Sequence, residues 1–285
     1  MCGIVGYIGP NQAAPFLLEG LTKLEYRGYD SAGIAVFDGS AVNVEKSVGR
    51  LVNLQHKVDN HPLPGQLGIG HTRWATHGRP SDSNSHPHTD CTGNFVVVHN
   101  GIIENYLHLK EGLLSRGHTF TSETDTEVVA HLLEEAYQGN FEDAVRTVLS
   151  KIDGSYALVF LCKDEPGKLI CTKQDNPLVI GLGTGENFIA SDIPAIISRT
   201  RQTYILSDGE IAVVTADTVT VTDRQGQKIE KKIFEVNWDA EAAEKGGYEH
   251  FMIKEIYEQP KAIRNTTTGR LAKDSQSIIF DELKW

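Results

Sequence analysis

The sequence predicts a layered α+β fold in which helices cover antiparallel sheets. Its 285 residues are 40% hydrophobic and 23% charged, which is enough apolar material for a sizeable core. The turn pairs Asp208-Gly209 and Gln225-Gly226 separate short apolar runs, as they do in β-hairpins. The helical patterns are clustered between runs of strands and do not alternate with them. This order disfavours a doubly wound parallel sheet.

The elements of the first half follow from apolar periodicity and turn residues. Ser122-Glu123-Thr124-Asp125 has the form of a capping box and would open a helix. Asn100-Gly101 is a turn pair that would close a strand. The polar stretch from His71 to Thr92 is too long for an ordinary connection and is typical of a functional loop. We expect strands at 3–8, 31–37, 41–47 and 94–99, and helices at 11–25, 104–116, 125–137 and 141–152.

The second half is predicted to be mostly strands. Gly181-x-Gly183-x-Gly185 resembles a dinucleotide loop, but it lies between two strands and its spacing is wrong, so we predict no nucleotide site there. Cys162 and Cys171 flank a hairpin and are expected to be core thiols. We expect strands at 155–162, 168–173, 177–183, 187–190, 203–206, 210–215 and 218–222, a linker at 236–248, and a helix at 249–258 that ends near Pro260.

Charge and hydropathy disfavour several classes of protein. Lys and Arg number 27 and Asp and Glu 38, a net charge of −11 without a basic run, which argues against nucleic-acid binding. No window holds the roughly 20 apolar residues of a membrane span. The N-terminus lacks the basic region of a signal peptide. We therefore expect a cytoplasmic protein that does not bind membranes and keeps its four cysteines reduced.

Cys2 is the first candidate for chemistry. Once Met1 is removed, a thiol and a free α-amine share one Cα. An α-amine titrates at about 7.7–8.0 and a free thiol at about 8.5, so the amine can act as the base that takes the proton of the thiol in the same residue. A cysteine that follows the start methionine by chance is the alternative. Gly3, which leaves the terminus uncrowded, and the strand that follows favour the nucleophile.

Two further pairs of residues suggest how a substrate would be bound. The Asn100 amide and the Gly101 N–H could both donate to an oxyanion, although Asn-Gly is also a common turn. Arg73 could bind a carboxylate through two parallel N–H bonds. Asp125 could bind an ammonium group, or it could only cap a helix. Together, Arg73 and Asp125 would suit an α-amino acid.

A metal site near Cys91 is not predicted. His86-Pro87-His88 and Cys91 lack the paired spacings of a zinc site, and His86 is more typical of a polar loop or a substrate neighbour. We therefore expect no metal ion and no cofactor.

Five motifs, with a sixth near the end of the chain, resemble those of the class II glutamine amidotransferases. Among these, the match is best with the branch that passes ammonia to fructose 6-phosphate. The motifs are MCGIVG at 1–6, EYRGYDSAG at 25–33, HTRWATHG at 71–78, HNGIIEN at 99–105, SETDTE at 122–127 and KEIYEQP at 254–260.

This resemblance implies an N-terminal-nucleophile (Ntn) hydrolase fold of four layers in αββα order, with two antiparallel sheets between helix layers. It implies a glutaminase domain at 1–240, followed at 241–285 by a linker and the start of a missing sugar isomerase domain. Cys2 would attack the side-chain amide of glutamine to give a glutamyl thioester and ammonia, and water would then release glutamate.

The resemblance also implies roles for individual residues. The Asn100 side chain and the Gly101 N–H would form the oxyanion hole, Arg73 would bind the α-carboxylate, and Asp125 would bind the α-ammonium. Trp74 would lie on the loop that closes over glutamine and gates the passage of ammonia. The remaining residues expected to line the pocket are Thr76, His77 and His86.

The isomerase half of such an enzyme is longer than this whole chain, and its phosphate-binding loops and lysine have no counterpart here. We therefore expect glutamine hydrolysis without synthesis of glucosamine 6-phosphate, and a homodimer for the full-length enzyme. Three alternatives stay open. They are a module of the phosphoribosylpyrophosphate amidotransferase or asparagine synthetase type, an inactive glutamine sensor such as retained Met1 would produce, and another cysteine-type amide hydrolase of the same fold.

Overall fold

The computed structural model describes residues 2–237, 248 and 250–268. The chain divides into two compact units, Met1–Asn237 and Trp238–Trp285. Within the described residues, no helix is long and apolar enough to cross a membrane.

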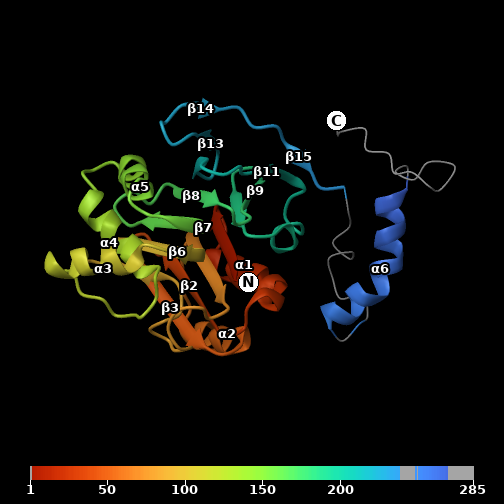
Figure 1. The fold of residues 1–285 in the computed structure, drawn as a ribbon, viewed down its shortest axis with the longest axis horizontal. Helices are drawn as coiled ribbons and strands as arrows, with labels where there is room; N and C mark the ends of the chain where they lie inside the picture. Colours follow the sequence, from red (N-terminus) through yellow and green to blue (C-terminus); the bar gives the residue numbers. More distant parts are fainter. Residues whose placement is uncertain (1, 238–247, 249, 269–285) are drawn as a thin grey trace. The chain divides into compact units, whose positions relative to one another are not determined.

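Two sheets form the centre of the first unit (Figure 1), and every pair of neighbouring strands described in them is antiparallel. The eight-stranded sheet has the order β15 (Phe234–Glu235), β11 (Gln202–Ile205), β9 (Val179–Leu182), β10 (Asn187–Ala190), β1 (Gly3–Ile8), β4 (Leu67–Arg73), β2 (Ser31–Phe37), β3 (Val42–Val48). The seven-stranded sheet has the order β14 (Lys228–Ile229), β13 (Val219–Thr222), β12 (Ile211–Val214), β8 (Leu169–Gln174), β7 (Gly154–Cys162), β6 (Phe95–Ile103), β5 (His88–Thr89).

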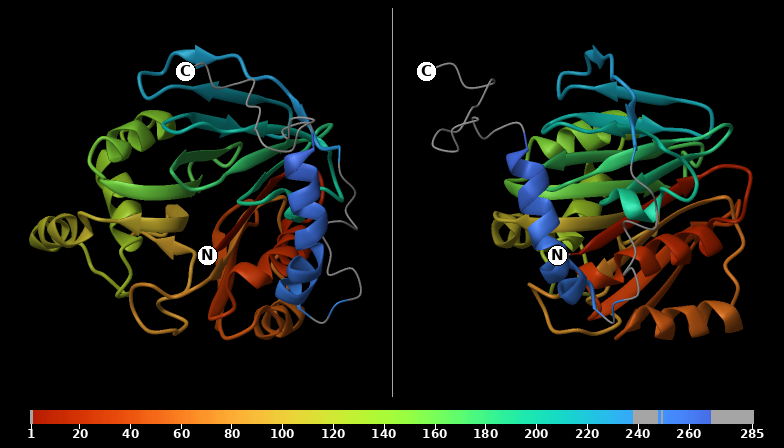
Figure 2. Two further views of the ribbon diagram at one scale, coloured as in Figure 1. Left: turned by 45° about the vertical axis from the view of Figure 1, so that its right-hand side comes forward. Right: turned by 90° about the vertical axis from the view of Figure 1, so that its right-hand side faces the viewer.

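Helices cover the outer face of each sheet (Figure 2). The helices α1 (Ala13–Leu24) and α2 (Leu51–Asn60) share a buried apolar cluster with the eight-stranded sheet. The helices α4 (Glu127–Ala136) and α5 (Phe141–Leu149) share another with the seven-stranded sheet, and α3 (Tyr106–Ser115) packs beside α4. The predicted αββα order of layers is confirmed.

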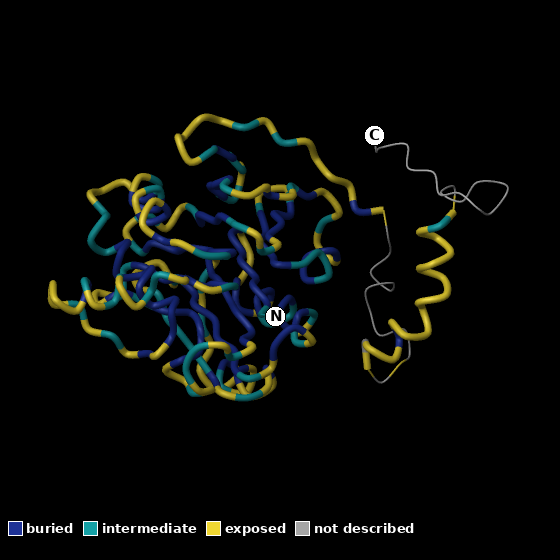
Figure 3. The backbone as a smooth tube through the Cα atoms, viewed as in Figure 1, coloured by how far each residue is buried: buried dark blue, intermediate teal, exposed yellow. Residues whose placement is uncertain are grey.

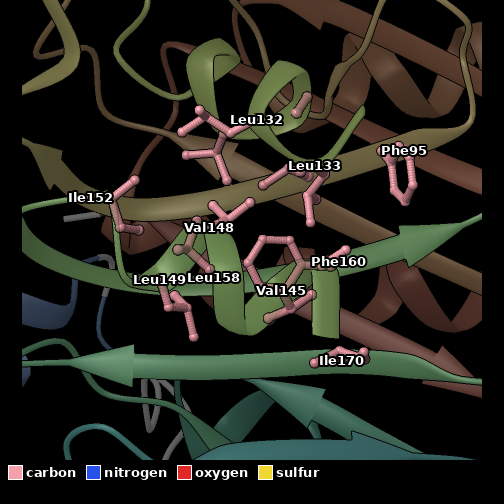
Figure 4. Close-up of a cluster of buried hydrophobic side chains, with 14 of the residues drawn as sticks. Phe95, Leu132, Leu133, Val145, Val148, Leu149, Ile152, Leu158, Phe160 and Ile170 are labelled. Atoms are coloured by element: carbon pink, nitrogen blue, oxygen red, sulfur yellow. The ribbon is translucent and has the colours of Figure 1, made fainter. Parts of the chain in front are cut away.

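The central strands are buried along most of their length (Figure 3). They supply apolar side chains to both of their faces, which explains their nearly continuous apolar runs. In β6, Phe95 and Val97 point toward the helices, whereas Val96 and Val98 point toward the other sheet. This alternation follows from the two-residue period of a strand. Figure 4 shows the outer side of the seven-stranded sheet, where Leu132 and Leu133 of α4 pack with Phe160 of β7.

The start of β1 lies inside its sheet, between β10 and β4. Gly3 pairs with Thr72 and Ile4 with His71, so the antiparallel register places Cys2 beside the end of β4 at Arg73. This register brings the first residues of the chain next to the HTRWATHG motif.

Several local predictions are wrong for identifiable reasons. The strand of residues 94–99 does not end at Asn100-Gly101, because β6 continues to Ile103 in register with β7. The Ser122 hydroxyl bonds Glu127 and Thr124 and does not cap a helix, and α4 begins only at Glu127. Long-range pairing and side-chain bonds outweigh the local turn and cap signals in both places.

Other predictions fail at the level of connections. Asp208-Gly209 joins β11 of one sheet to β12 of the other and forms no hairpin, whereas Gln225-Gly226 joins the paired strands β13 and β14 as predicted. The expected loop from His71 begins within strand β4. The helix α2 was not predicted, because only Leu51, Leu54 and Val58 of its ten residues are buried.

In the second unit, α6 (Phe251–Thr267) continues past Pro260, although a helix ending near this proline was predicted. Good helix formers on both sides of the proline favour continuation of the helix. Most of the expected linker at 236–248 lies outside the described residues.

Candidate functional site

A small recess lies where β1 begins. It contains seven of the nine residues proposed for the site, while Asn100 and His77 are not among its lining residues. Its lining residues are Cys2, Arg73, Trp74, Thr76, His86, His99, Gly101, Thr124, Asp125 and Thr126.

The Cys2 thiol is held against the backbone of Trp74. Its sulfur accepts the Trp74 N–H at 3.2 Å and lies 3.6 Å from the Trp74 carbonyl oxygen. Burial raises the pKa of the Cys2 thiol, while the Trp74 N–H and the guanidinium groups of Arg73 and Arg27 act in the opposite direction. Because burial dominates, the sulfur needs a nearby base to react at neutral pH.

Two side chains fix the backbone of Cys2. The carbonyl oxygen of Cys2 accepts hydrogen bonds from Arg27 Nε and Asn100 Nδ2, both at 3.1 Å. Arg27 is itself held by an ion pair of 2.9 Å with Asp192. The orientation of the nucleophile is therefore set by β6 and by the segment that follows α1.

His71 determines which way the Asn100 amide points. Its Nε2 lies 2.9 Å from the His99 carbonyl oxygen and 3.0 Å from Asn100 Oδ1. Burial lowers the pKa of His71 to about 3, so the ring is neutral. Both neighbours of Nε2 are acceptors, so this nitrogen carries the proton. Asn100 Oδ1 is thereby fixed toward His71, and its Nδ2 faces Cys2.

Three more buried histidines surround this contact. The His86 ring stacks on that of His71 with centroids 4.1 Å apart and lies 4.7 Å from that of His88. Burial lowers the pKa of His86, His88 and His99 as well. These rings are therefore neutral near pH 7, and the charges lining the recess come from Arg73 and Asp125.

Arg73 is buried and has an unused donor. Its Nη2 donates to the carbonyl oxygens of His77 and Gly78, the second at 3.2 Å. Its Nη1 is buried and has no hydrogen-bond partner among the described residues. A buried, unpaired guanidinium nitrogen is costly, and a substrate carboxylate would satisfy it.

Asp125 supplies the opposite charge. Its Oδ2 accepts the Ile103 N–H at 2.8 Å, which ties it to β6. It therefore does not serve as the helix cap that was the alternative interpretation. Among the described side chains Asp125 forms no ion pair with Arg73, yet its charge acts on that guanidinium across the recess. The two charges are separated, as a zwitterion requires.

The other predicted residues lie on the segment after β4. Thr76 is exposed and lines the recess, and Trp74 is 46% exposed with its ring edge-on to Tyr29 at 5.6 Å. The His77 ring instead packs edge-on against Tyr106 at 5.4 Å. His77 contributes to the site through its carbonyl oxygen, which Arg73 binds.

Two glycines are required by geometry. Gly101 has φ +122°, and a Cβ there would lie 2.0 Å from the Ser155 carbonyl oxygen. A Cβ on Gly28 would lie 2.8 Å from the Trp74 nitrogen, whose N–H binds the Cys2 sulfur. Each of these positions excludes a side chain.

Sequence reasoning assigned no role to Arg27, His71, His99 and Thr126. All four lie within motifs that the resemblance singled out, so the motifs marked their importance but not their function. His99 Nδ1 pairs with the Thr126 hydroxyl at 2.9 Å and connects β6 to the start of α4. No spacing in the sequence signals that contact.

A family model described as a glutamine amidotransferase domain matches residues 71–198, a range that includes Arg73, Asn100 and Asp125. The chain contains a glutamine amidotransferase domain. Its sequence is 60% identical over 283 residues to a glutamine–fructose-6-phosphate aminotransferase (isomerizing) of Caldanaerobacter subterraneus subsp. tengcongensis, covering 99% of this chain and 46% of that protein. It is 56% identical over 274 residues to the protein of the same name from Pyrococcus horikoshii, covering 95% and 46%. The chain thus spans about half the length of these relatives.

Solved structures agree on the fold of this amidotransferase domain. A glutamine phosphoribosylpyrophosphate amidotransferase from B. subtilis superposes with a TM-score of 0.69 at 26% identity, over 78% of this chain and 49% of that one. A class-II glutamine aminotransferase domain protein from Silicibacter pomeroyi gives a TM-score of 0.52 at 15% identity, over 78% and 99%, a likeness of fold. The resemblance of the motifs to those of the class II glutamine amidotransferases is confirmed, and so is the Ntn fold that this resemblance implied.

Proposed function

We propose that residues 1–240 hydrolyse the side-chain amide of glutamine to glutamate and ammonia, with Cys2 as the nucleophile. The observation that carries this proposal is that the thiol of Cys2 shares one recess with the unpaired guanidinium nitrogen of Arg73 and the carboxylate of Asp125. An α-amino acid carries the two complementary charges. The names of the relatives and of the matching family add that its side chain is that of glutamine.

The chemistry starts once Met1 has been removed. The free α-amine of Cys2 takes the thiol proton, directly or through one water, and the sulfur attacks the amide carbon. The tetrahedral intermediate then collapses, the C–N bond breaks, and the ammonium of Cys2 returns the proton so that ammonia leaves. Water attacks the thioester in the same way, and glutamate departs with the thiol restored.

The negative oxygen of each tetrahedral intermediate requires donors in fixed positions. We assign this role to Asn100 Nδ2 and the Gly101 N–H. The His71 contact fixes Nδ2 on the side of Cys2, where one of its two hydrogens binds the Cys2 carbonyl oxygen. The second hydrogen is left for the substrate, and Gly101 lines the same recess.

Recognition of the substrate is divided between the two charged groups. Arg73 would bind the α-carboxylate through Nη1, and Asp125 would bind the α-ammonium. Thr76 and His86 would complete the walls, His77 would act through its carbonyl oxygen, and Trp74 would close over glutamine and gate the departure of ammonia.

We extend the proposal to the whole protein on the strength of the relatives' names alone. The ammonia would pass to fructose 6-phosphate in an isomerase half, giving glucosamine 6-phosphate in a cytoplasmic homodimer. Residues 241–285 would then form the linker and the start of that half. A module of the phosphoribosylpyrophosphate amidotransferase type is less favoured, because that structural relative is only 26% identical.

The test is glutamate release by the purified chain, with the intact mass recorded to show whether Met1 is present. We expect the chain without Met1 to release glutamate and Cys2→Ala to release none. Cys91→Ser is the matched control because Cys91 is the other accessible thiol and lies outside the recess. Glutamine binding without release by a chain that lacks Met1 would contradict the proposal and favour a glutamine sensor.

A further inference from the structure

A second cluster of polar side chains lies outside the recess, on the helix side of the seven-stranded sheet. Cys91 follows β5 in the turn before β6, and His118 lies between α3 and α4. His131 and Glu134 are one turn apart on α4. One ligand atom from each of these four residues lies within 4.8 Å of all the others.

The separations match the edges of a tetrahedron around one ion. Zinc bond lengths of about 2.3 Å to sulfur and about 2.0–2.1 Å to nitrogen or oxygen put sulfur and nitrogen about 3.6 Å apart, and nitrogen and oxygen about 3.4 Å apart. In the structure, Cys91 Sγ lies 3.7 Å from His118 Nδ1 and 3.5 Å from His131 Nδ1. Glu134 Oε2 lies 3.2 Å from His118 Nδ1 and 3.5 Å from His131 Nδ1.

A carboxylate lies beside the outer nitrogen of each ring, at hydrogen-bond distance for His118 but beyond it for His131, whose Nε2 has no hydrogen-bond partner among the described residues. His118 Nε2 lies 3.2 Å from Glu135 Oε1, and His131 Nε2 lies 3.7 Å from Glu127 Oε1. A proton on Nε2 leaves the lone pair of Nδ1 directed at the other ligands. This carboxylate–histidine arrangement is the one that orients metal-binding histidines in proteins.

The sulfur of Cys91 is also placed to be a thiolate ligand. The Thr119 N–H points at it with a distance of 3.4 Å, and the N–H of Cys91 itself donates to Glu134 Oε2 at 3.2 Å. A thiolate and a carboxylate together carry two negative charges, which a divalent cation neutralises. Sulfur and imidazole ligands favour zinc over magnesium or calcium.

We propose that Cys91, His118, His131 and Glu134 bind one zinc ion in a closed, structural site. Four protein ligands leave no open position for a substrate or a reactive water. The ion would tie the β5–β6 turn and the segment after α3 to α4. That segment continues into Thr124, Asp125 and Thr126, so the ion would brace one wall of the recess.

This inference revises the expectation that Cys91 takes part in no metal site. The sequence argument considered the nearby His86 and His88, which the structure places in the buried group of histidines around the recess. The histidines that reach Cys91 are 27 and 40 residues further along the chain. The alternative is a network of polar contacts without metal, in which His118 lies between Glu134 and Glu135.

Cobalt(II) distinguishes the two arrangements, because a cobalt–thiolate bond gives a charge-transfer absorption band. The chain is prepared without a histidine tag, stripped of metal by a chelator and titrated with Co²⁺. We expect one equivalent to produce the band and one equivalent of Zn²⁺ to abolish it. We expect Cys91→Ser to remove the band and to weaken cobalt binding by at least about tenfold.

Three controls make the result specific. His118→Ala is expected to weaken cobalt binding as Cys91→Ser does, while His108→Ala, at an exposed position on α3, is expected to leave it unchanged. Cys2→Ala is expected to keep the band, which excludes the thiol of the recess. Absence of the band in the parent chain, or an undiminished band in Cys91→Ser, would overturn the proposal.

Thermal unfolding gives a readout that does not involve cobalt. Zinc is expected to raise the Tm of the parent chain and to leave the Tm of Cys91→Ser unchanged, since a ligand stabilises only the state that binds it. Equal shifts in both proteins would count against the site. Cobalt binding and thermal unfolding do not depend on glutamate release, so the outcome of the metal test is independent of the proposed hydrolysis.

Discussion

Replacement of Arg73 by glutamine tests how the recess recognises its substrate. The variant removes Nη1, a buried donor that has no hydrogen-bond partner among the described residues, together with the positive charge. A hydrogen bond between charged groups contributes about 1.5–3 kcal/mol. Its loss corresponds to an increase of about 10- to 150-fold in the KM for glutamine. The kcat is expected to change little, because the interaction is made equally in the ground state and the transition state.

The assay is the initial rate of glutamate release as a function of glutamine concentration. Arg73→Lys keeps the charge but loses the planar fork, so its KM should lie between those of the parent and Arg73→Gln. Arg79→Gln is the control, since Arg79 is an exposed arginine on the same segment.

A substrate analogue makes the reasoning refutable. The decarboxylated analogue of glutamine keeps the amine and the side-chain amide but lacks the α-carboxylate. The parent should prefer glutamine to the analogue by about the same 10- to 150-fold in kcat/KM, and Arg73→Gln should show almost no preference. An unchanged KM for glutamine, or a preference in Arg73→Gln equal to that of the parent, would refute the assignment of Arg73.

Three further predictions concern stability and reactivity. Gly101→Ala should lower the free energy of unfolding by about 1–3 kcal/mol, because its φ of +122° disfavours a side chain and the Cβ would meet Ser155; an unchanged urea midpoint would contradict this. Burial lowers the pKa of His71 from near 6.5 to about 3, so its contribution to stability is full above pH 6.5 and is lost as the pH falls from there toward 3. His71→Gln should therefore reduce the dependence of the unfolding free energy on pH between 6.5 and 5 by up to about 1.4 kcal/mol per pH unit, as measured by urea titrations. Burial raises the pKa of Cys2, so iodoacetamide should alkylate it more slowly than free cysteine at pH 7.5, with a rate that rises as the pH is raised; equal rates would count against a buried thiol.

The sequence itself predicts helices covering antiparallel sheets, whereas the four-layer αββα order was implied only by the resemblance of its motifs; the structure has this order because both faces of the strands are buried. Apolar runs such as the one around Val96 and Val98 are continuous, so a strand with one face in solvent would expose half of these side chains. The clustered helices then cover the outer faces of the sheets. Cys162 and Cys171 are buried as predicted. What fails is local: β6 continues through the turn pair Asn100-Gly101 because it pairs with the distant strand β7, and the Ser122 hydroxyl bonds Glu127 and does not cap a helix.

The candidate site, too, can be predicted from the sequence only in part. Its reactive and charged residues, Cys2, Arg73 and Asp125, are visible because they lie within the motifs. Their supports are not visible, because Arg27, which holds the Cys2 carbonyl oxygen, is distant from it in sequence. The cluster at Cys91 is hidden for the same reason, since its four members come from three separate segments.

The position of β1 has a consequence for how the protein is made. This strand, the first of the described strands in chain order, has one neighbour in β4 and the other in β10, which ends at Ala190. At a synthesis rate of about 5–20 residues per second, roughly 10–40 s pass before the second neighbour exists. During that time the start of the chain is accessible to the aminopeptidase that the proposed chemistry requires. Under the proposed function, removal of Met1 can therefore precede the enclosure of Cys2 between its neighbouring strands.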